Sequence, residues 1–165
     1  MGARDFPRIE IDEALARLER MALFMGAVIE GASRDELLFQ PGNRGEFSLV
    51  EQACHLRDLE REGYLVRARR MLAETAPELQ GFDGDRIAAE RDYRTQDARR
   101  AVQDFIAARA ELVAIFRAAA PADFERDATF EGRRITLASL LAMVAEHDRG
   151  HREEIQEILD VLEAP

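Results

Sequence analysis

The sequence predicts an all-α protein, a four-helix bundle with a long connection between its second and third helices. Apolar residues return every three or four positions along four long segments, which is the period of an amphipathic helix. Five prolines and ten glycines are few for 165 residues and favour helices over a turn-rich β-sandwich. A chain of this length suits one compact domain, so residues 1–165 are expected to form a single four-helix bundle domain.

The first helix is predicted from a stripe of apolar residues that would face the core. The stripe contains Ile11, Leu15, Leu18, Ala22, Met25 and Ile29. It fades at Gly31, and the next stretch carries Ser33 and Glu36 at the spacing that caps a short helical turn. Residues 41–45 contain one proline and two glycines and are expected to form a loop.

The second helix is predicted to start at Ser48, because Glu51 follows at the spacing of a capping box. Its apolar pattern continues to Leu72. The polar segment 77–94 is the expected long connection, and residues 85–93 within it are a candidate short helix.

The third helix is predicted to be capped by Thr95 and to end shortly before Pro121. Residues 122–135 are expected to form a turn with Gly132 at its tip. Thr136 then caps the fourth helix. The apolar face of that helix contains Leu137, Leu140, Val144, Ile155, Ile158 and Leu162.

Composition argues against nucleic acid and membrane partners. The net charge of −10 and the pI near 4.9 would repel a phosphate backbone. No apolar run approaches the ~20 residues that span a bilayer, and the N-terminus is too charged for a signal peptide. The one cysteine, Cys54, excludes an intramolecular disulfide and fits a reducing compartment. A cytoplasmic location is therefore expected.

Three histidines are the candidate metal ligands. His147 and His151 occupy positions that the pattern of the fourth helix reserves for the core. Residues four apart share a helical face, so both imidazoles can reach one ion, or they can simply hydrogen-bond to neighbouring helices. His55, at the edge of the apolar face of the second helix, supplies a third imidazole. Three neutral imidazoles leave a coordination position open, as in catalytic sites, and allow zinc, nickel or iron.

Other side chains near the histidines fit alternative sites less well. Asp148 stands where a zinc protease would carry its longer general-base glutamate, and the repeated Glu-x-x-His pairs of di-iron bundles are missing. Cys54 lies ~100° around the helix from His55 and is expected to be a small buried residue. Asp58 and Glu62 could orient a ligand, but a solvated helix face is the preferred interpretation.

Two segments resemble the DinB-like superfamily, also described as the bacillithiol S-transferase or YfiT-like fold. They are PGNRGEFSLVEQACHLRDLE at residues 41–60 and FEGRRITLASLLAMVAEHDRGHREEI at residues 130–155. The family typically shows a Pro-Gly loop, Trp-Ser and Glu-x-x-x-His in the first, and a Gly turn, a Thr-Leu helix start and His-x-x-x-His in the second. Phe47 replaces the usual tryptophan.

The resemblance implies that His55, His147 and His151 bind a divalent metal, nickel or zinc, in a bundle that is often dimeric. It also implies a small-molecule substrate and, as the first hypothesis, a thiol S-transferase that uses a low-molecular-weight thiol. An arginine near the site, such as Arg133 or Arg44, could then hold an anionic cofactor, and the sequence favours neither of the two. A metal-dependent hydrolase and a non-catalytic metal-binding stress-response protein are the alternatives.

Overall fold

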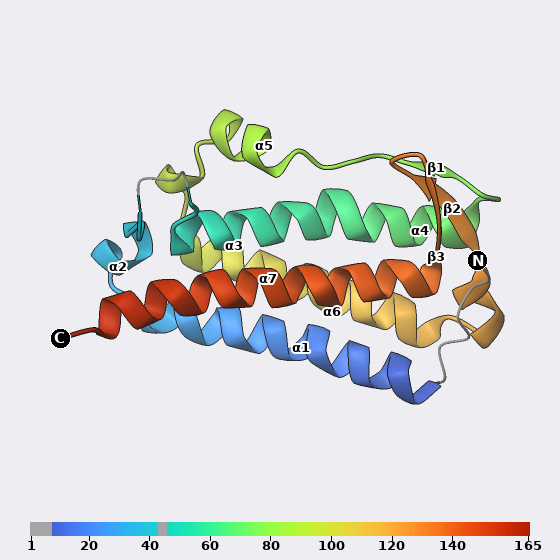
Figure 1. Ribbon diagram of the computed structural model, residues 1–165, viewed down its shortest axis with the longest axis horizontal. Helices are drawn as coiled ribbons and strands as arrows, with labels where there is room; N and C mark the ends of the chain where they lie inside the picture. Colours follow the sequence, from blue (N-terminus) through green and yellow to red (C-terminus); the bar gives the residue numbers. More distant parts are fainter. Residues whose placement is uncertain (1–7, 43–45) are drawn as a thin grey trace.

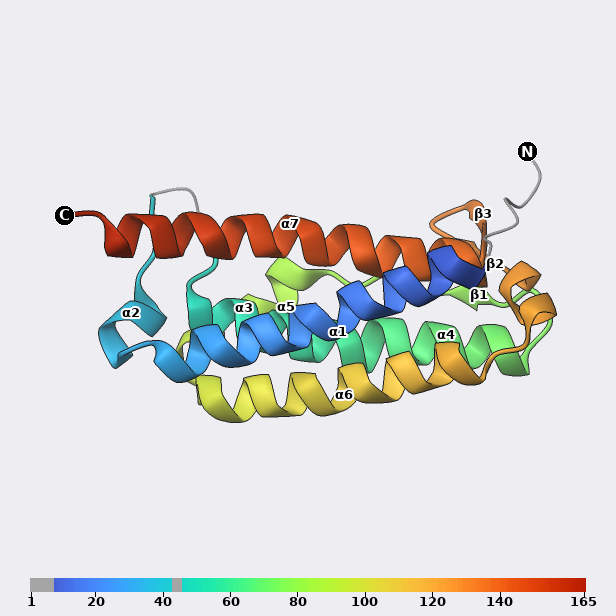
Figure 2. The same ribbon diagram turned by 90° about the horizontal axis from the view of Figure 1, so that it is seen from below.

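Four long helical segments pack side by side in the computed structural model, which describes residues 8–42 and 46–165 (Figures 1 and 2). The first, third and fourth segments are α1 (Arg8–Gly31), α6 (Ala98–Ala118) and α7 (Leu137–Glu163). The second consists of α3 (Leu49–Asp58), the π-helix η1 (Leu59–Tyr64) and α4 (Leu65–Ala73). The predicted four-helix bundle is confirmed. None of these helices, within the described ranges, is both long and apolar enough to cross a membrane.

The connection between the second and third segments crosses the outside of the bundle, beside α3 (Figure 1). It carries β1 (Glu78–Leu79), the short helix α5 (Gly84–Glu90) and the 3-10 helix η2 (Tyr93–Thr95). Both the long connection and the short helix within it are therefore confirmed. A further short helix, α2 (Arg34–Leu38), follows α1 with the predicted capping box of Ser33 and Glu36.

Residues 122–135 form more than the predicted turn. After the 3-10 helix η3 (Pro121–Glu125), β2 (Asp127–Phe130) and β3 (Arg133–Thr136) make an antiparallel hairpin, and β1 joins β2 in parallel. Glu131 and Gly132 both have positive φ, 49° and 74°, as the two central residues of a type I′ turn require. Gly132 is thus at the tip as predicted, but the strands are too short for a strand period to appear in the sequence.

Side-chain caps fix the starts of the main helices. Ser48 forms its capping box with Glu51, and the Thr136 hydroxyl accepts from the Ser139 amide, both as predicted. The predicted Thr95 cap is wrong. The N-cap of α6 is Asp97, whose carboxylate accepts from the Arg100 amide at 3.0 Å. A carboxylate is as good a cap as a hydroxyl, so the pattern could not choose between the two positions.

The π-helix lies in the middle of the second segment and was not predicted. Its wider turn places Leu59 and Glu60, which are neighbours in sequence, both in the interior with exposures of 5% and 1%. Such π turns are uncommon and often occur near functional sites. Here it brings a carboxylate into the bundle core.

A buried ion cluster joins three of the four segments. The Arg109 guanidinium on α6 donates two hydrogen bonds to Glu60, at 2.6 and 3.0 Å, and two to Asp148 on α7, at 2.7 and 3.0 Å. It also donates to the carbonyl of Leu18 on α1 at 3.0 Å. Burial raises the pKa of both carboxyls and the Arg109 charge opposes that shift. Asp148 therefore lies in this cluster and not in the position of a protease base.

Candidate metal centre

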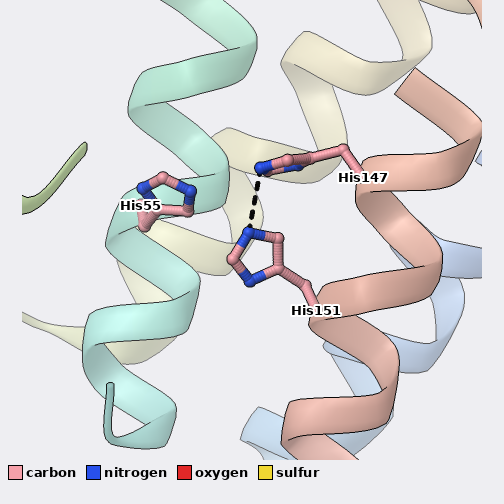
Figure 3. Close-up of side chains that lie close together, drawn as sticks. All are labelled: His55, His147 and His151. Carbon is pink, nitrogen blue, oxygen red and sulfur yellow. Dashed lines mark hydrogen bonds between the residues drawn. The ribbon is translucent and has the colours of Figure 1, made fainter. Parts of the chain in front are cut away.

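The three predicted histidines come together between α3 and α7 (Figure 3). One ligand nitrogen from each residue lies within 4.8 Å of the others. The ring centroids of His147 and His151 are 4.3 Å apart, and the His55 ring is 4.8 Å from that of His151. His55 and His151 are buried and His147 is half-buried. These distances suit three rings that turn toward one ion.

The imidazoles of His55 and His147 are poor bases in this environment. Burial, with the neighbouring imidazoles in second place, lowers the pKa of His55 to about 4 and that of His147 to about 3. The Nδ1 atoms of both rings are buried and have no hydrogen-bond partner. Buried polar atoms nearly always have a partner, so two unpartnered ring nitrogens in one cluster indicate a ligand. Neutral imidazole is also a good donor for zinc, nickel and iron, so the residues fit a divalent ion.

A hydrogen-bonded chain orients the third imidazole. The Nδ1 of His151 lies 2.7 Å from Gln52 Oε1 and 3.3 Å from Glu154 Oε2, and Gln52 Nε2 donates to that same Glu154 oxygen at 2.7 Å. Because both neighbours of Nδ1 are acceptors, the proton of His151 is assigned to Nδ1. Metal-binding histidines usually have such partners. The lone pair of Nε2 then faces His147 Nε2, which lies 3.1 Å away (Figure 3).

The sequence reasoning missed Gln52 and Glu154. Gln52 lies three residues before His55 and Glu154 three residues after His151, so both share a helical face with a predicted ligand. The same spacing relates Asp58 to His55, and Asp58 was already a candidate for orienting a ligand. Spacing alone therefore could not rank Gln52 and Glu154 above Asp58.

Asp58 and Glu62 have different surroundings. Asp58 is buried and accepts from the Tyr93 hydroxyl at 2.6 Å and from Arg91 at 2.8 Å, so the preferred interpretation of a solvated face is wrong for this residue. Glu62 is exposed and pairs with Arg91, as that interpretation expects. Both carboxylates anchor the segment after α5 to the second helical segment.

Cys54 points away from the histidines, as predicted. Its Sγ lies 3.7 Å from Gln96 Oε1, and burial raises the pKa of the thiol to about 11. The protonated, buried thiol is a poor nucleophile and a poor metal ligand. Its role is packing.

A cavity of about 310 Å³ opens over His55 and His151. It is also lined by Pro41, Glu46, Phe47, Gln52, Asp85, Glu154, Glu157 and Ile158. Arg133 is exposed on β3 and is not among these residues, while Arg44 lies outside the described residues. A larger groove, about 910 Å³, runs between α1 and α7 and includes none of the three histidines. We therefore regard the smaller cavity as the access to the site.

Gly84, the first residue of α5, packs directly on the His55 ring. A Cβ at this position would lie 2.7 Å from His55 Cε1 and 3.0 Å from Nδ1. We expect Gly84→Ala to displace the ring and to weaken metal binding about tenfold or more, the scale seen when the support of a ligand is lost. Calorimetric titration with zinc would measure this.

Gly150 provides the matched control, because it lies in α7 between two of the histidines and a Cβ there meets nothing within 4 Å. We expect Gly150→Ala to leave metal affinity unchanged and to raise the free energy of unfolding by about 0.5–1 kcal/mol. Equal metal affinities for the two alanine variants would contradict the role given to Gly84.

The lowered pKa values also predict how stability depends on pH. As pH falls from about 6.5 toward 4, the unfolded chain binds protons at His55 and His147 that the folded metal-free protein does not bind. The free energy of unfolding should therefore decrease, by up to ~1.4 kcal/mol per pH unit for each such proton. Urea unfolding at pH 7 and pH 5 would measure the slope. A His55→Gln/His147→Gln variant should lose much of it, and an unchanged slope would contradict the burial argument.

Comparison with known proteins identifies the family. The family model of the DinB superfamily matches residues 10–155. The chain belongs to the DinB superfamily. A search of curated proteins found no match. Among solved structures, YfiT from Bacillus subtilis superimposes with a TM-score of 0.87 at 19% sequence identity, over 98% of this chain and 93% of that one. At this identity the match shows that this DinB-superfamily member shares the fold of YfiT.

Proposed function

We propose that His55, His147 and His151 bind one divalent metal ion, nickel or zinc, and that the protein is a metal-dependent enzyme acting on a small molecule. The observation that carries the proposal is the cluster itself. One nitrogen of each imidazole lies within 4.8 Å of the others, beside a cavity of about 310 Å³. Three neutral ligands preserve the full charge of the ion and leave a coordination position free, which is typical of catalytic sites.

A bound divalent ion supplies Lewis acidity, which lowers the pKa of a thiol or water that coordinates to it. Residues of the chain orient the histidine rings and shape the cavity beside them. Gln52 and Glu154 hold the His151 ring with its Nε2 turned toward His147 Nε2, and Gly84 packs against the His55 ring. Phe47 and Ile158 give the cavity an apolar wall. A nucleophile bound there is partly shielded from water, which strengthens its electrostatic interactions.

The proposed reaction is S-transfer from a low-molecular-weight thiol to an electrophile. The thiol loses its proton to solvent, its sulfur forms a bond to carbon, and the leaving group departs with the electron pair of the bond that breaks. The family resemblance supports this reaction. Metal-loaded protein with thiol and an alkyl halide such as monobromobimane should accelerate thioether formation, and His151→Ala should not. Rates equal to the uncatalysed reaction for several thiols would exclude S-transfer.

Hydrolysis is the second candidate, because YfiT, whose fold this chain shares, is described as a probable metal-dependent hydrolase. In that case water replaces the thiol as nucleophile. Cleavage of activated esters or amides without thiol, abolished by a chelator, would favour it. Tight metal binding without activity in either assay would support the non-catalytic metal-binding alternative.

We also propose that the protein is a homodimer, as the family resemblance suggests. A cytoplasmic location is proposed because the one cysteine, Cys54, is free and buried, which fits a reducing compartment. Sedimentation velocity should give twice the 18.7 kDa mass of the chain. A species of one chain mass at micromolar concentration would contradict the dimer.

A further inference from the structure

The cavity beside the histidines has a charge that restricts what it can bind. Its described lining contains four carboxylates, Glu46, Asp85, Glu154 and Glu157, and neither arginine nor lysine. Glu154 Oε2 accepts a hydrogen bond from Gln52 Nε2 at 2.7 Å. An anionic thiol cofactor would therefore be repelled by this lining.

The other three carboxylates reach the cavity from separate parts of the chain. Glu46 precedes α3, Asp85 lies on α5 and Glu157 on α7, and all three residues are exposed. Within residues 8–42 and 46–165, none of the three forms an ion pair with an arginine. On the nearby surface of α7, by contrast, Arg149 pairs with two glutamates. No arginine of the described residues therefore neutralises these three carboxylates.

An aromatic ring and an unpartnered nitrogen complete the lining. The Phe47 ring is half-buried and its centroid lies 5.4 Å from that of His55. The face of an aromatic ring attracts cations, and carboxylates beside an aromatic ring are a common way to bind an ammonium group. His55, which also lines the cavity, is 93% buried with its Nδ1 unpartnered, so a molecule bound in the cavity lies directly against the candidate metal centre.

We propose that this cavity binds a small-molecule substrate that carries a positively charged group, such as a quaternary ammonium or a protonated amine, beside the group that approaches the histidines. The cation lies between Phe47 and the carboxylates of Glu46, Asp85 and Glu157. This inference rests on the proposed metal centre and adds the substrate class. It replaces the sequence-based expectation of an anionic cofactor held by arginine.

Three thiols of similar size and different charge provide the test, each titrated into the cobalt(II)-loaded protein. They are 2-mercaptoethyl-trimethylammonium, its neutral isostere 3,3-dimethylbutane-1-thiol, and 2-mercaptoethanesulfonate. Sulfur-to-cobalt charge-transfer absorption reports binding without any need for turnover. We expect the cationic thiol to bind at least tenfold more tightly than the neutral one and the anionic thiol to bind weakest. The preference should shrink in 0.5 M salt because salt screens exposed charges.

The variant Glu46→Gln/Asp85→Asn/Glu157→Gln should bring the cationic and neutral thiols within about threefold of each other. Glu153→Gln is the control, since Glu153 is an exposed residue of α7 outside the cavity, and it should keep the preference. Equal binding of all three thiols, no thiol binding, or tightest binding of the anion would overturn the cationic substrate while leaving the metal centre intact. A preference that survives the triple substitution would overturn its assignment to these carboxylates. Failure of cobalt to bind at all would instead remove the metal centre and this inference with it.

Discussion

Arg109→Met is expected to lower the free energy of unfolding by about 3–5 kcal/mol, the scale seen when one partner of a buried ion pair is removed. Arg109 is 1% exposed, and its guanidinium makes four hydrogen bonds to Glu60 and Asp148. Methionine would fill a similar volume but would leave two carboxylates facing each other in the core. Urea unfolding at pH 7 would measure the loss.

Arg69→Met is the matched control, because Arg69 pairs with Glu111 on the surface and both side chains are more than half exposed. Its effect should stay within about 1 kcal/mol. Without Arg109, the pKa values of Glu60 and Asp148 rise further, so the folded variant takes up protons as pH falls. The stability gap to the natural protein should therefore narrow between pH 7 and pH 5. A loss no larger than that of Arg69→Met would show that the cluster is not an important source of stability.

His151→Ala is expected to reduce zinc or nickel affinity by about a hundredfold or more, and to abolish any metal-dependent activity. Loss of a supporting partner alone costs about 10–100-fold, and this substitution removes the ligand together with its bonds to Gln52 and Glu154. Competition titration against a chromophoric chelator would measure the affinity.

Cys54→Ala is the control for that substitution. Cys54 is buried on α3 next to His55, but its Sγ faces Gln96 and not the histidines. The alanine variant should retain metal affinity within about threefold. If His151→Ala also retained it, the ion would have to bind elsewhere in the chain.

The sequence predicted the structure correctly in segments where a local pattern, such as the helical period or a capping box, determines the conformation. The 3.6-residue period defined the four long helices, and the Ser48–Glu51 and Thr136 caps defined two of their starts. The same period placed His147 and His151 on the apolar face of the fourth helix. Burial of a polar side chain costs free energy unless it has a partner, so these two positions indicated a site. The position of His55 at the edge of an apolar face made it a candidate third member, and the family motifs strengthened that assignment.

The features that the sequence did not predict depend on contacts between distant segments. The π-helix buries Glu60, which pairs with Arg109 on α6, and Arg109 in turn pairs with Asp148 on α7. No local sequence pattern predicts these contacts between helices. The Gln52–Glu154 hydrogen bond likewise joins α3 to α7. The acidic lining of the cavity arises from three elements that only the tertiary fold brings together.

Anomalous diffraction from crystals of the metal-loaded protein, recorded at the absorption edge of the added ion, tests the central claim most directly. The account predicts one peak per chain, with nitrogens of His55, His147 and His151 at about 2.0–2.1 Å if the ion is zinc. The absence of a peak between α3 and α7 in fully loaded crystals, or a peak bound by other residues, would contradict it.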